Sequence, residues 1–449
     1  MHIAVCAVIV RAAFEESDEM SKFDSGKLEK TELKIGIIPL TDCAVLVMAK
    51  VKGFFAKHGL DVSLSSEASW ANIRDKVQTG LLDGAQMLAP MPIASTLGIG
   101  GIKTPMITAF SLDLNGNGIT VSNELYQRML DADPDSAVQP NRCAYALKKV
   151  VDAHKHAGRK PMTFAMVFPY SSHNYQLRYW LATAGINPDV DLRLTVVPPP
   201  HMLENLIDKN IDGFCVGEPW NEVAVMQGAG RTLLTSYEIW NNSPEKVFGV
   251  TAEWAERHPN THRAVLMALL ETAEWLDEPG HREEVAEMLA KEFINVSSEV
   301  VKMSMTGTFQ FAHDESPKPL PDFNVFHRYA ANYPWLSHAE WFISQMVRWG
   351  QLHEPVNITE GAKSVYRPEL FVEVARMLGR PYPLLSHKCE GINDGSWKLN
   401  DATTPIVMGA DRFLDGKVYD PADLVGYIKS FSISRLSFSL EDLAQLNGS

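Results

Sequence analysis

The sequence predicts an α/β protein of two similar lobes with a ligand cleft between them. One observation is a step that occurs twice, as "LLDGAQMLAPMP" at Leu81–Pro92 and as "NIDGFCVGEPW" at Asn210–Trp220. Both stretches run from a helix-like segment through Asp-Gly into a short apolar run and then a proline. The other observation is that strand and helix patterns alternate before each step, which is typical of a mostly parallel sheet covered by helices.

The elements of the first lobe follow one another from residue 33. "LKIGIIPL" is rich in β-branched residues and ends after a proline, so it predicts a strand. The spacing of apolar residues then predicts a helix over 43–59, which Gly59 can end. A strand over 60–67, a further helix and a strand over 83–88 complete a β-α-β-α-β series.

The second lobe repeats this series from residue 161. "PMTFAMVFP" predicts a strand, and the helix over 171–185 can begin at Ser171 or Ser172. "LRLTVVPPP", "HMLENLIDKN" and "DGFCVG" then predict strand, helix and strand. The two Asp-Gly steps therefore occupy equivalent places in two lobes, although such turns also recur by chance in α/β enzymes. Ligands of open α/β sheets bind beyond the carboxyl ends of the strands, so both steps should end at the cleft.

The predicted organisation has five parts. Beyond residue 240 the chain is dominated by amphipathic helices, and it contains no low-complexity linker. We expect a leader, a first lobe in two segments that flank the second lobe, and a C-terminal extension that packs on the lobes. These parts are residues 1–32 (leader), 33–125 (lobe I), 126–240 (lobe II), 241–385 (return to lobe I with helical additions) and 386–449 (extension).

Composition excludes several classes of protein. With 45% hydrophobic and 21% charged residues, the 449-residue chain is long enough for two cores. No stretch approaches the roughly 18 uninterrupted apolar residues of a membrane span. The net charge of -14 argues against direct binding of nucleic acid. The five cysteines lie far apart without a C-x-x-C pair, which indicates reduced, partly buried thiols rather than disulfides or a zinc site.

The first ten residues, "MHIAVCAVIV", bear on localisation. They are apolar but contain neither Lys nor Arg, and an acidic stretch follows them. This pattern lacks the basic region and the clear cleavage site of a secretory signal. We therefore expect a cytoplasmic protein that does not associate with a membrane.

Local motifs give no support to an enzyme, a metal site or a cofactor. The glycine-rich "GIGGIKTP" lacks the glycine before lysine that a phosphate loop requires. Asp113–Glu124 fits the calcium-loop pattern, but the residues before it predict a strand instead of the entering helix of an EF-hand. His154 and His156 are better explained as a solvated helix end. Neither H-E-x-x-H nor G-x-S-x-G occurs.

Polar side chains at the predicted cleft suit a small anion. A lysine, amide donors and backbone N–H groups can replace the hydration that a buried anion loses. A tryptophan face gives a planar anion a flat wall. Each residue also has a structural explanation, as core tryptophan, satisfied core amide or surface lysine. The candidates at the predicted cleft are Trp70, Gln86, Asn117, His173, Glu218 and Lys246.

Taken together, these pieces resemble a known family, the nitrate- and bicarbonate-binding solute receptors. The resemblance extends over residues 33–434 and includes "LKIGIIPLTDCAVLVMAKVKGFFAKHGLDV", "ASWANIRDKV", "GNGITV", "FPYSSHNYQLRYWLATAGINPD", "VGEPWN" and "PEKVFGVTAEW". It implies a periplasmic-binding-protein type II-like fold with an anion in the interlobe cleft. It also implies that Trp70, Asn117 and Lys246 form the anion site.

Lys246 carries most of what the resemblance implies about the ligand. Nitrate receptors resemble this chain in placing a lysine there, whereas bicarbonate receptors tend to have a glutamate. A cation supplies the charge opposite to nitrate without a metal, so nitrate or nitrite is the expected ligand. Gln86 and His173 are implied to lie nearby. Where transport receptors often carry a histidine before "FP", this chain has Met166 and Val167, and His173 is the candidate substitute.

The absence of an export pattern makes the chain resemble the cytoplasmic nitrate/nitrite sensors of the family, the NasS type. Such sensors hold an RNA-binding antiterminator of the ANTAR type (NasT-like) inactive and release it when nitrate binds. Closure of the lobes would bias a two-state partner surface, and the partner, not this acidic chain, would contact RNA.

Two alternatives remain open. One is the substrate-binding component of an ABC transporter for nitrate or a related anion, which a processed or lipid-modified N-terminus would favour. The other is an enzyme of thiamine-precursor synthesis, since such enzymes share this fold. That activity would need a reactive histidine or cysteine cluster at the cleft.

Overall fold

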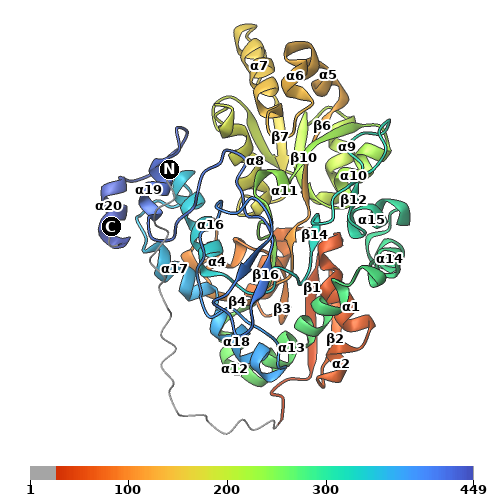
Figure 1. Ribbon diagram of the computed structural model, residues 1–449, viewed down its shortest axis with the longest axis vertical. Coiled ribbons are helices and arrows are strands. Elements are labelled where there is room, and N and C mark those ends of the chain that lie inside the picture. The colour runs from red at the N-terminus through yellow and green to blue at the C-terminus, as the bar shows by residue number, and fades with distance from the viewer. Residues whose placement is uncertain (1–26, 448–449) are drawn as a thin grey trace.

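The computed structural model describes residues 27–447, which form two lobes around two five-stranded sheets (Figure 1). In the first lobe the strand order is β2-β1-β3-β11-β4. β1 is parallel to β2 and β3, whereas β11 runs antiparallel to β3 and β4. The strands are β1 (Glu32–Ile37), β2 (Asp61–Ser66), β3 (Gly84–Leu88), β4 (Met106–Ser111) and β11 (Lys246–Thr251).

The second lobe repeats this plan with the strand order β10-β6-β9-β7-β8. β7 is parallel to β8 and β9, and β6 is the reversed strand between β9 and β10. β7, β8 and β9 therefore correspond to β1, β2 and β3, and β6 corresponds to β11. The prediction of two similar, mostly parallel lobes is confirmed. The strands are β6 (Asn117–Ser122), β7 (Thr163–Met166), β8 (Arg193–Val196), β9 (Gly213–Gly217) and β10 (Gly230–Thr235).

The aspartates of the two Asp-Gly steps make the same pair of bonds. The backbone N–H of Asp83 bonds to the carbonyl of Lys34 in β1, and its carboxylate accepts from the Lys34 N–H, both at 2.9 Å. Asp212 makes the equivalent bonds with Thr163 at the start of β7, at 2.7 and 2.8 Å. Each aspartate thus fixes the start of one strand against its parallel neighbour.

The glycines of the two steps are required by close packing. A Cβ on Gly84 would lie 2.6 Å from the Phe248 ring, and a Cβ on Gly213 would lie 2.7 Å from the Phe164 ring. Both contacts are shorter than packed carbon atoms tolerate, so a larger residue would push the neighbouring side chain away. The repeated Asp-Gly sequence is therefore explained by the same local structure in both lobes.

The chain passes to the second sheet between β4 and β6 and returns between β10 and β11. The predicted lobe boundary at 125/126 falls after β6, which pairs with β9 and β10 and so belongs to the second sheet. The boundary at 240/241 lies between β10 and β11. The pattern of "GNGITV" is that of a strand in either lobe, and it does not indicate which sheet the strand joins.

The helix predicted over 43–59 is interrupted. α1 (Ala44–Val51) and α2 (Phe54–Lys57) are separated by Gly53, whose φ of 80° lies in the left-handed region that glycine adopts without strain. Gly59 follows α2 and has a φ of 76°, as expected of a glycine just beyond the end of a helix. The short helix η1 (Thr41–Cys43) precedes α1 and follows β1.

Helices from both ends of the lobe I sequence cover its sheet. The 18-residue helix α13 packs on α1, α2 and α18, and α17 packs on α4 and β4. The segment that returns after the second lobe therefore completes the first core. These helices are α3 (Trp70–Gln78), α4 (Met91–Leu97), α12 (Ala252–Arg257), α13 (Pro259–Leu276), α16 (Leu336–Arg348), α17 (Ile358–Val365) and α18 (Pro368–Met377).

In the second lobe, α8 packs on β7 and β9, and α10 packs on β6, β9 and β10. Ser171 caps α8 by accepting from the Asn174 N–H at 3.0 Å, as one of the two predicted caps. The helices are α5 (Asn123–Ala132), α6 (Pro134–Ala137), α7 (Cys143–His156), α8 (Ser172–Thr183), α9 (Met202–Ile207), α10 (Trp220–Met226), α11 (Ser236–Ile239) and the short η2 (Pro199–His201).

A third group of elements joins the lobes. α15 contacts both η1 of the first lobe and α10 of the second. The group contains α14 (Pro279–Met288), η3 (Leu289–Ile294), α15 (Ser298–Met305) and the short strands β5 (Leu114–Asn115), β12 (Thr308–Phe309), β13 (Lys318–Pro319) and β14 (Asn324–Val325).

The C-terminal segment from residue 386 lies against both lobes. The ring of Phe413 is stacked 4.8 Å from Trp240 of the second lobe and 6.2 Å from Trp341 in α16. Figure 1 shows this blue segment beside α8 and α16. It contains β15 (Trp397–Leu399), β16 (Ile406–Met408), α19 (Leu424–Lys429) and α20 (Leu440–Asn447).

Two predictions concern membrane-spanning helices and the cysteines. Within residues 27–447 no helix has the length and apolar character needed to cross a membrane. The thiols of Cys43, Cys143 and Cys215 are buried, as predicted. The apolar stretch of the first ten residues, with Cys6, and most of the predicted leader 1–32 lie outside the described residues.

Candidate functional site

The predicted site residues gather where the two lobes meet. β7 leads into the loop before α8, which carries His173, and β9 ends at Gly217. The reversed strands β6 and β11 begin with Asn117 and Lys246, so their first residues lie at the same edge as the carboxyl ends of the other strands. Trp70 opens α3 after β2. The topology therefore places residues from both lobes around one interlobe position.

Lys246 is fully buried among acidic groups. Its Nζ lies 2.7 Å from Asp42 Oδ2, and it also donates to Glu245 Oε1. The same Nζ lies 5.5 Å from the centroid of the Trp70 ring, a cation–π contact. The backbone N–H of Lys246 donates to Asp113 Oδ1 at 2.9 Å. Burial alone would lower the pKa of Lys246, but the Asp42 and Glu245 carboxylates outweigh it and raise that pKa, so the ammonium stays charged.

Three buried carboxyl groups surround this ammonium. Burial raises the pKa of Asp42 and of Glu245, against the lowering effect of Lys246. Burial also raises the pKa of Asp113 well above its usual range, and Asp42 adds to that rise. One cation cannot neutralise three buried carboxylates, so burial keeps the pKa of each of these groups above its usual value. A protonated carboxyl donates a hydrogen bond, which allows these groups to face an anion.

His173 is a neutral imidazole at the first turn of α8. Burial lowers its pKa well below the usual range, and Lys246 lowers it further. Its Nε2 lies 3.5 Å from Glu245 Oε1, and neither ring nitrogen has a hydrogen-bond partner among residues 27–447. A neutral ring at this distance does not form an ion pair. His173 therefore offers an N–H group that a ligand can use.

Polar atoms converge on Gly217. The position that a Cβ of Gly217 would occupy lies 3.4 Å from Asn117 Oδ1, 3.4 Å from Asp42 Oδ2 and 3.6 Å from His173 Nε2. These are ordinary contact distances, so the missing side chain leaves a small space lined by atoms of both lobes. A glycine here leaves room for no more than a methyl-sized group, and the three polar atoms mark Gly217 as a meeting point of the two lobes.

Asn117 belongs to a chain of amides. Its Nδ2 donates to Gln176 Oε1 at 3.0 Å, and Gln176 Nε2 donates to Ser243 Oγ at 3.1 Å. Its Oδ1 is buried without a partner among the described residues. The orientation of an asparagine amide is assigned from its bonds, and the reverse orientation would present Nδ2 to the space at Gly217.

Trp70 lies next to Lys246 in the interlobe cluster, and its role as a wall for the anion stays a prediction. The side chain is 1% exposed, and its Nε1 is buried with no partner in the described part of the chain. Ser69 fixes the start of α3 by accepting from the Asn72 N–H at 3.2 Å. An unpartnered buried N–H costs about 1–3 kcal/mol, so Trp70 has a donor that a ligand would satisfy.

Two predicted residues have other roles. Gln86 uses both ends of its amide inside the first lobe, because Oε1 accepts from the Ile38 N–H at 2.8 Å and Nε2 donates to Asp42 Oδ1. It positions Asp42 and does not face the space. The Glu218 side chain turns away, since its Oε2 accepts from the Glu222 N–H of α10 at 3.2 Å. One oxygen of the Glu218 carboxylate therefore bonds to the start of α10, while Oε1 has no partner among the described residues, and a contact of Glu218 with a ligand stays a prediction.

The sequence interpretation missed Asp42, Ser172, Gly217 and Glu245. Ser172 and Glu245 are chain neighbours of the predicted His173 and Lys246, and Ser172 Oγ donates to Glu245 Oε2. Asp42 lies in η1, directly beyond the carboxyl end of β1. The strand-end rule that located the other residues would also have found it.

Bonds between the lobes close the site. The Thr41 N–H of the first lobe donates to the Glu218 carbonyl of the second at 2.8 Å, and Trp220 Nε1 donates to the Pro39 carbonyl at 3.3 Å. The Ser172–Glu245 bond also joins the lobes. The cluster around Lys246 is therefore enclosed between two lobes in a closed arrangement.

The Asp113–Glu124 segment is not an EF-hand. β4 precedes it, as the sequence predicts, and β6 lies within it. Asp113 accepts from the Lys246 N–H, so it belongs to the cluster between the lobes. Among residues 27–447 no group of three or more histidine, cysteine, aspartate and glutamate side chains is placed to hold a metal.

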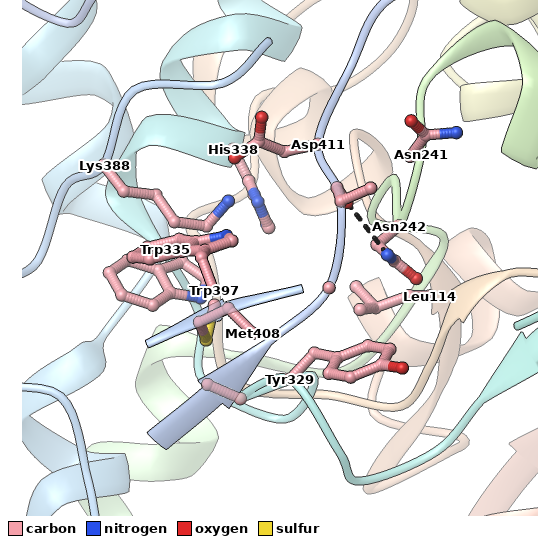
Figure 2. Close-up of a pocket in the computed structure, with 13 residues that line it drawn as sticks. Leu114, Asn241, Asn242, Tyr329, Trp335, His338, Lys388, Trp397, Met408 and Asp411 are labelled. Atoms are coloured by element: carbon pink, nitrogen blue, oxygen red, sulfur yellow. Dashed lines mark hydrogen bonds between the residues drawn. The ribbon is translucent and has the colours of Figure 1, made fainter. Parts of the chain in front are cut away.

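A separate cavity lies between the second lobe and the C-terminal segment (Figure 2). Figure 2 shows Lys388, Trp335 and His338 on one side of it and Leu114 and Asn242 on the other. Its volume of about 20 Å³ is that of one or two water positions. It is distinct from the cluster around Lys246 and too small for the predicted ligand.

Comparison with known proteins identifies the family of the chain. A family model described as the NMT1-like family matches residues 26–290. The nitrate import ATP-binding protein NrtC of Synechocystis sp. is 41% identical over 415 residues, which cover 91% of this chain and 56% of that protein. The bicarbonate transport ATP-binding protein CmpC of the same organism is 36% identical over 421 residues, again 91% and 56%. This chain thus spans a little over half the length of these two relatives.

A solved structure matches most of the chain. The crystal structure of the periplasmic nitrate-binding protein NrtA from Synechocystis PCC 6803 has a TM-score of 0.80 and 32% identity, and the match covers 91% of this chain and 100% of that one. The predicted periplasmic-binding-protein type II-like fold is confirmed. The predicted resemblance to nitrate- and bicarbonate-binding receptors is confirmed as well.

Proposed function

We propose, from the premise that this chain belongs to the NMT1-like family, that it is a receptor for nitrate or nitrite held between its lobes. One observation carries the proposal. Lys246 supplies a buried positive charge where the lobes meet, and the buried ring nitrogens of His173 and Trp70 have no partners among residues 27–447. Fixed donors around a cation are what a dehydrated oxyanion requires.

Binding without catalysis fits the chemistry of the cluster. The enzyme alternative needs a reactive histidine or cysteine. Burial raises the pKa of the Cys215 thiol well above its usual range, so little of it is the thiolate that acts as a nucleophile. His173 bonds to no nucleophile among residues 27–447. The relatives themselves are named as transport and binding proteins.

The role that we propose first is that of the substrate-binding component of a nitrate import system. The whole-length likeness to the periplasmic nitrate-binding protein NrtA supports this role. Lys246 supports nitrate over bicarbonate, because a lysine at this position resembles the nitrate receptors. A closed, two-lobed arrangement suits capture of a solute and its delivery to a transporter.

A second candidate is a cytoplasmic nitrate sensor. Identity to the ATP-binding protein NrtC, 41%, exceeds the 32% to the periplasmic NrtA. ATP is an intracellular nucleotide, so the likeness to an ATP-binding protein supports a location of this chain on the cytoplasmic side of the membrane. In that role, closure around nitrate would control an ANTAR-type antiterminator, and the partner would bind the RNA.

The test is a calorimetric titration of the purified chain with nitrate, nitrite and bicarbonate at fixed pH and salt. We expect nitrate or nitrite to bind at micromolar concentration. Lys246→Glu should weaken that binding about a thousandfold, since it places a further acid where the ligand needs a cation. The control is Lys398→Glu, which makes the same charge change at an exposed lysine in β15. No binding of either anion, or an unaltered affinity in Lys246→Glu, would remove the proposal.

A further inference from the structure

A second charged pocket lies where α8 of the second lobe meets α16 and the C-terminal segment. Its volume is about 240 Å³, which suits a ligand smaller than a typical drug molecule. Tyr179 and Phe431 contribute its aromatic surface. Its polar lining consists of Thr183, Arg348, Asp415, Lys417, Ser430 and Ser432.

Arg348 is the unusual member of this lining. Its side chain is 2% exposed, and its centre lies 3.6 Å from the centroid of the Phe431 ring and 4.4 Å from that of Trp349. Its Nε donates to the Ile433 carbonyl at 3.1 Å, and Nη1 donates to Gln345 Oε1 at 3.3 Å. Both acceptors are neutral. Among residues 27–447 no carboxylate forms an ion pair with this guanidinium.

The balance of charge in the pocket is positive. Arg348 and Lys417 bring two cations, and Asp415 brings one carboxylate. That carboxylate is already engaged, because its Oδ1 accepts from the Tyr179 hydroxyl at 2.7 Å and from the Lys417 N–H at 3.2 Å. Among residues 27–447, Lys417 Nζ donates to one acceptor, the neutral Ser430 carbonyl, at 3.1 Å. Two cations without a paired acid, next to hydroxyl groups, form a surface complementary to an oxyanion.

We propose that this pocket binds a small oxyanion, a phosphate or a carboxylate, through Arg348 and Lys417. The Nη2 group of the guanidinium has no acceptor among residues 27–447, and the buried position protects an interaction there from screening by salt. The hydroxyl groups of Thr183, Ser430 and Ser432 supply further donors at the rim. The space at Gly217 is a different position, on the interlobe face.

The helix α8 connects the two positions. Its first turn carries Ser172 and His173 of the interlobe cluster, and Tyr179 and Thr183 at its other end line the second pocket. Twelve residues of helix span about 18 Å, so the two positions are joined by one rigid element. Tyr175 also ties α8 to the segment after α16, since its hydroxyl donates to Gln351 Oε1 at 2.6 Å.

An oxyanion bound in this pocket would contact α8 of the second lobe and α16, which packs with the first. Such a contact favours the closed arrangement that also encloses Lys246. Each ligand therefore increases the affinity of the other, because coupling between two sites is reciprocal. This second part of the inference rests on the proposed function, whereas the first part does not.

The first experiment titrates the wild-type chain with inorganic phosphate and, separately, with succinate, in the absence of nitrate. We expect at least one of the two to bind with one-to-one stoichiometry. Lys417→Met should weaken that binding about tenfold, since it removes one charge-assisted bond. Lys429→Met, at an exposed lysine in α19, removes the same charge outside the pocket and should change nothing. Failure of both anions to bind, or equal effects of the two variants, would overturn the proposal.

The second experiment titrates nitrate in the presence of a saturating concentration of the anion that binds. We expect the affinity for nitrate to rise about fivefold or more, and Lys417→Met to abolish the rise. An unchanged nitrate affinity would overturn the coupling. If nitrate does not bind at all, the proposed function fails, and the result of the first experiment still decides whether the pocket binds an oxyanion.

Discussion

Lys246 and Arg348 are both almost completely buried, but the charges around them differ. Lys246 is 0% exposed and contacts the carboxyl groups of Asp42 and Glu245, whereas Arg348 is 2% exposed and donates to neutral acceptors. Burial lowers the pKa of Arg348 to about 10, although Tyr179 and other groups nearby oppose this, and it remains charged at neutral pH. A ligand anion must compete with carboxylates for Lys246, while Arg348 has no acid to release.

This difference predicts that protons affect ligand binding at the interlobe cluster but not through the residues of the Arg348 pocket. At the interlobe cluster, the ligand carries a charge of the same sign as the carboxylates, so those groups must take up protons when it binds. In the pocket of Arg348, the carboxylate of Asp415 is exposed and engaged elsewhere. Anion binding at the interlobe cluster should therefore depend on pH. At the Arg348 pocket, any pH dependence of binding should come from the ligand itself.

The largest expected effect on stability follows from removal of the Lys246 charge. Lys246→Met leaves Asp42 and Glu245 without their cation, so their pKa values rise further above those of the unfolded chain. The folded state then holds protons that the unfolded state releases, and stability falls as pH rises from about 4. We expect a loss of about 3 kcal/mol at about pH 8 and a smaller loss at about pH 5.

Arg348→Met is the matched comparison for that variant. It removes two bonds to neutral acceptors together with the cost of a buried charge, and a methionine retains the packing of the stem. The expected loss is about 1 kcal/mol, with the same value at both pH values because no acid loses its partner. Urea denaturation of both variants at the two pH values measures this. Equal losses with equal pH dependence would show that the difference in charge has no energetic consequence.

The next effect is on the affinity for nitrate. The pKa values of Asp42 and Glu245 are already raised by burial, and a bound anion raises them further. Uptake of one proton makes binding tighter as pH falls, by up to about tenfold per pH unit below the pKa of the bound state. Calorimetry between about pH 6 and about pH 8 in buffers of different ionisation enthalpy would count the protons taken up.

Asp42→Asn provides the control for this proton linkage. The amide keeps the shape of the carboxyl group but cannot take up a proton. We expect the variant to bind nitrate more tightly at about pH 8 and to show a shallower pH dependence, as one competing charge is gone. A wild-type affinity that stays constant across the pH range would contradict the idea that the carboxyl groups compete with the ligand.

The architecture of the lobes was predictable because it depends on repeated local patterns. The paired Asp-Gly steps follow from a backbone bond and a close packing contact that a short sequence encodes completely, as the equivalent bonds of Asp83 and Asp212 demonstrate. The sheet to which β6 belongs was not predictable. A six-residue strand pattern contains no information about its partners, which lie at β9 and β10.

For the candidate site, the strand-end rule and the resemblance located Lys246, Trp70, Asn117 and His173, which the structure brings together. Whether these residues bind the anion is still a prediction. The direction of a side chain is decided by tertiary contacts, so the turn of Glu218 toward Glu222 could not be predicted from "VGEPW". A glycine offers no chemical signal either, and Gly217 emerges only from the atoms that surround it.

Glu218 and Glu222 give the third and smallest test of how burial and charge pairing differ between sites. Here two acids are buried, and no cation among the described residues pairs with them. Glu222 has no bonded partner for either carboxyl oxygen among the described residues. Burial raises the pKa of Glu218 to about 8, and it raises the pKa of Glu222 well above its usual range with Glu218 adding to the rise. Between about pH 5 and about pH 8 the folded chain therefore holds a proton that the unfolded chain has lost, which means that stability falls with rising pH.

Glu218→Gln removes this titration while keeping an oxygen that can accept from the Glu222 N–H. Relative to wild type, the variant should gain about 1 kcal/mol or more on going from about pH 5 to about pH 8, measured by urea denaturation at both values. Glu256→Gln, at an exposed glutamate, is the control and should show no such gain. A gain that is equal at the two pH values would mean that Glu218 is ionised throughout. A buried carboxylate in this fold would then be stable without a neighbouring cation. The burial of Asp42 and Glu245 would no longer require the positive charge of Lys246.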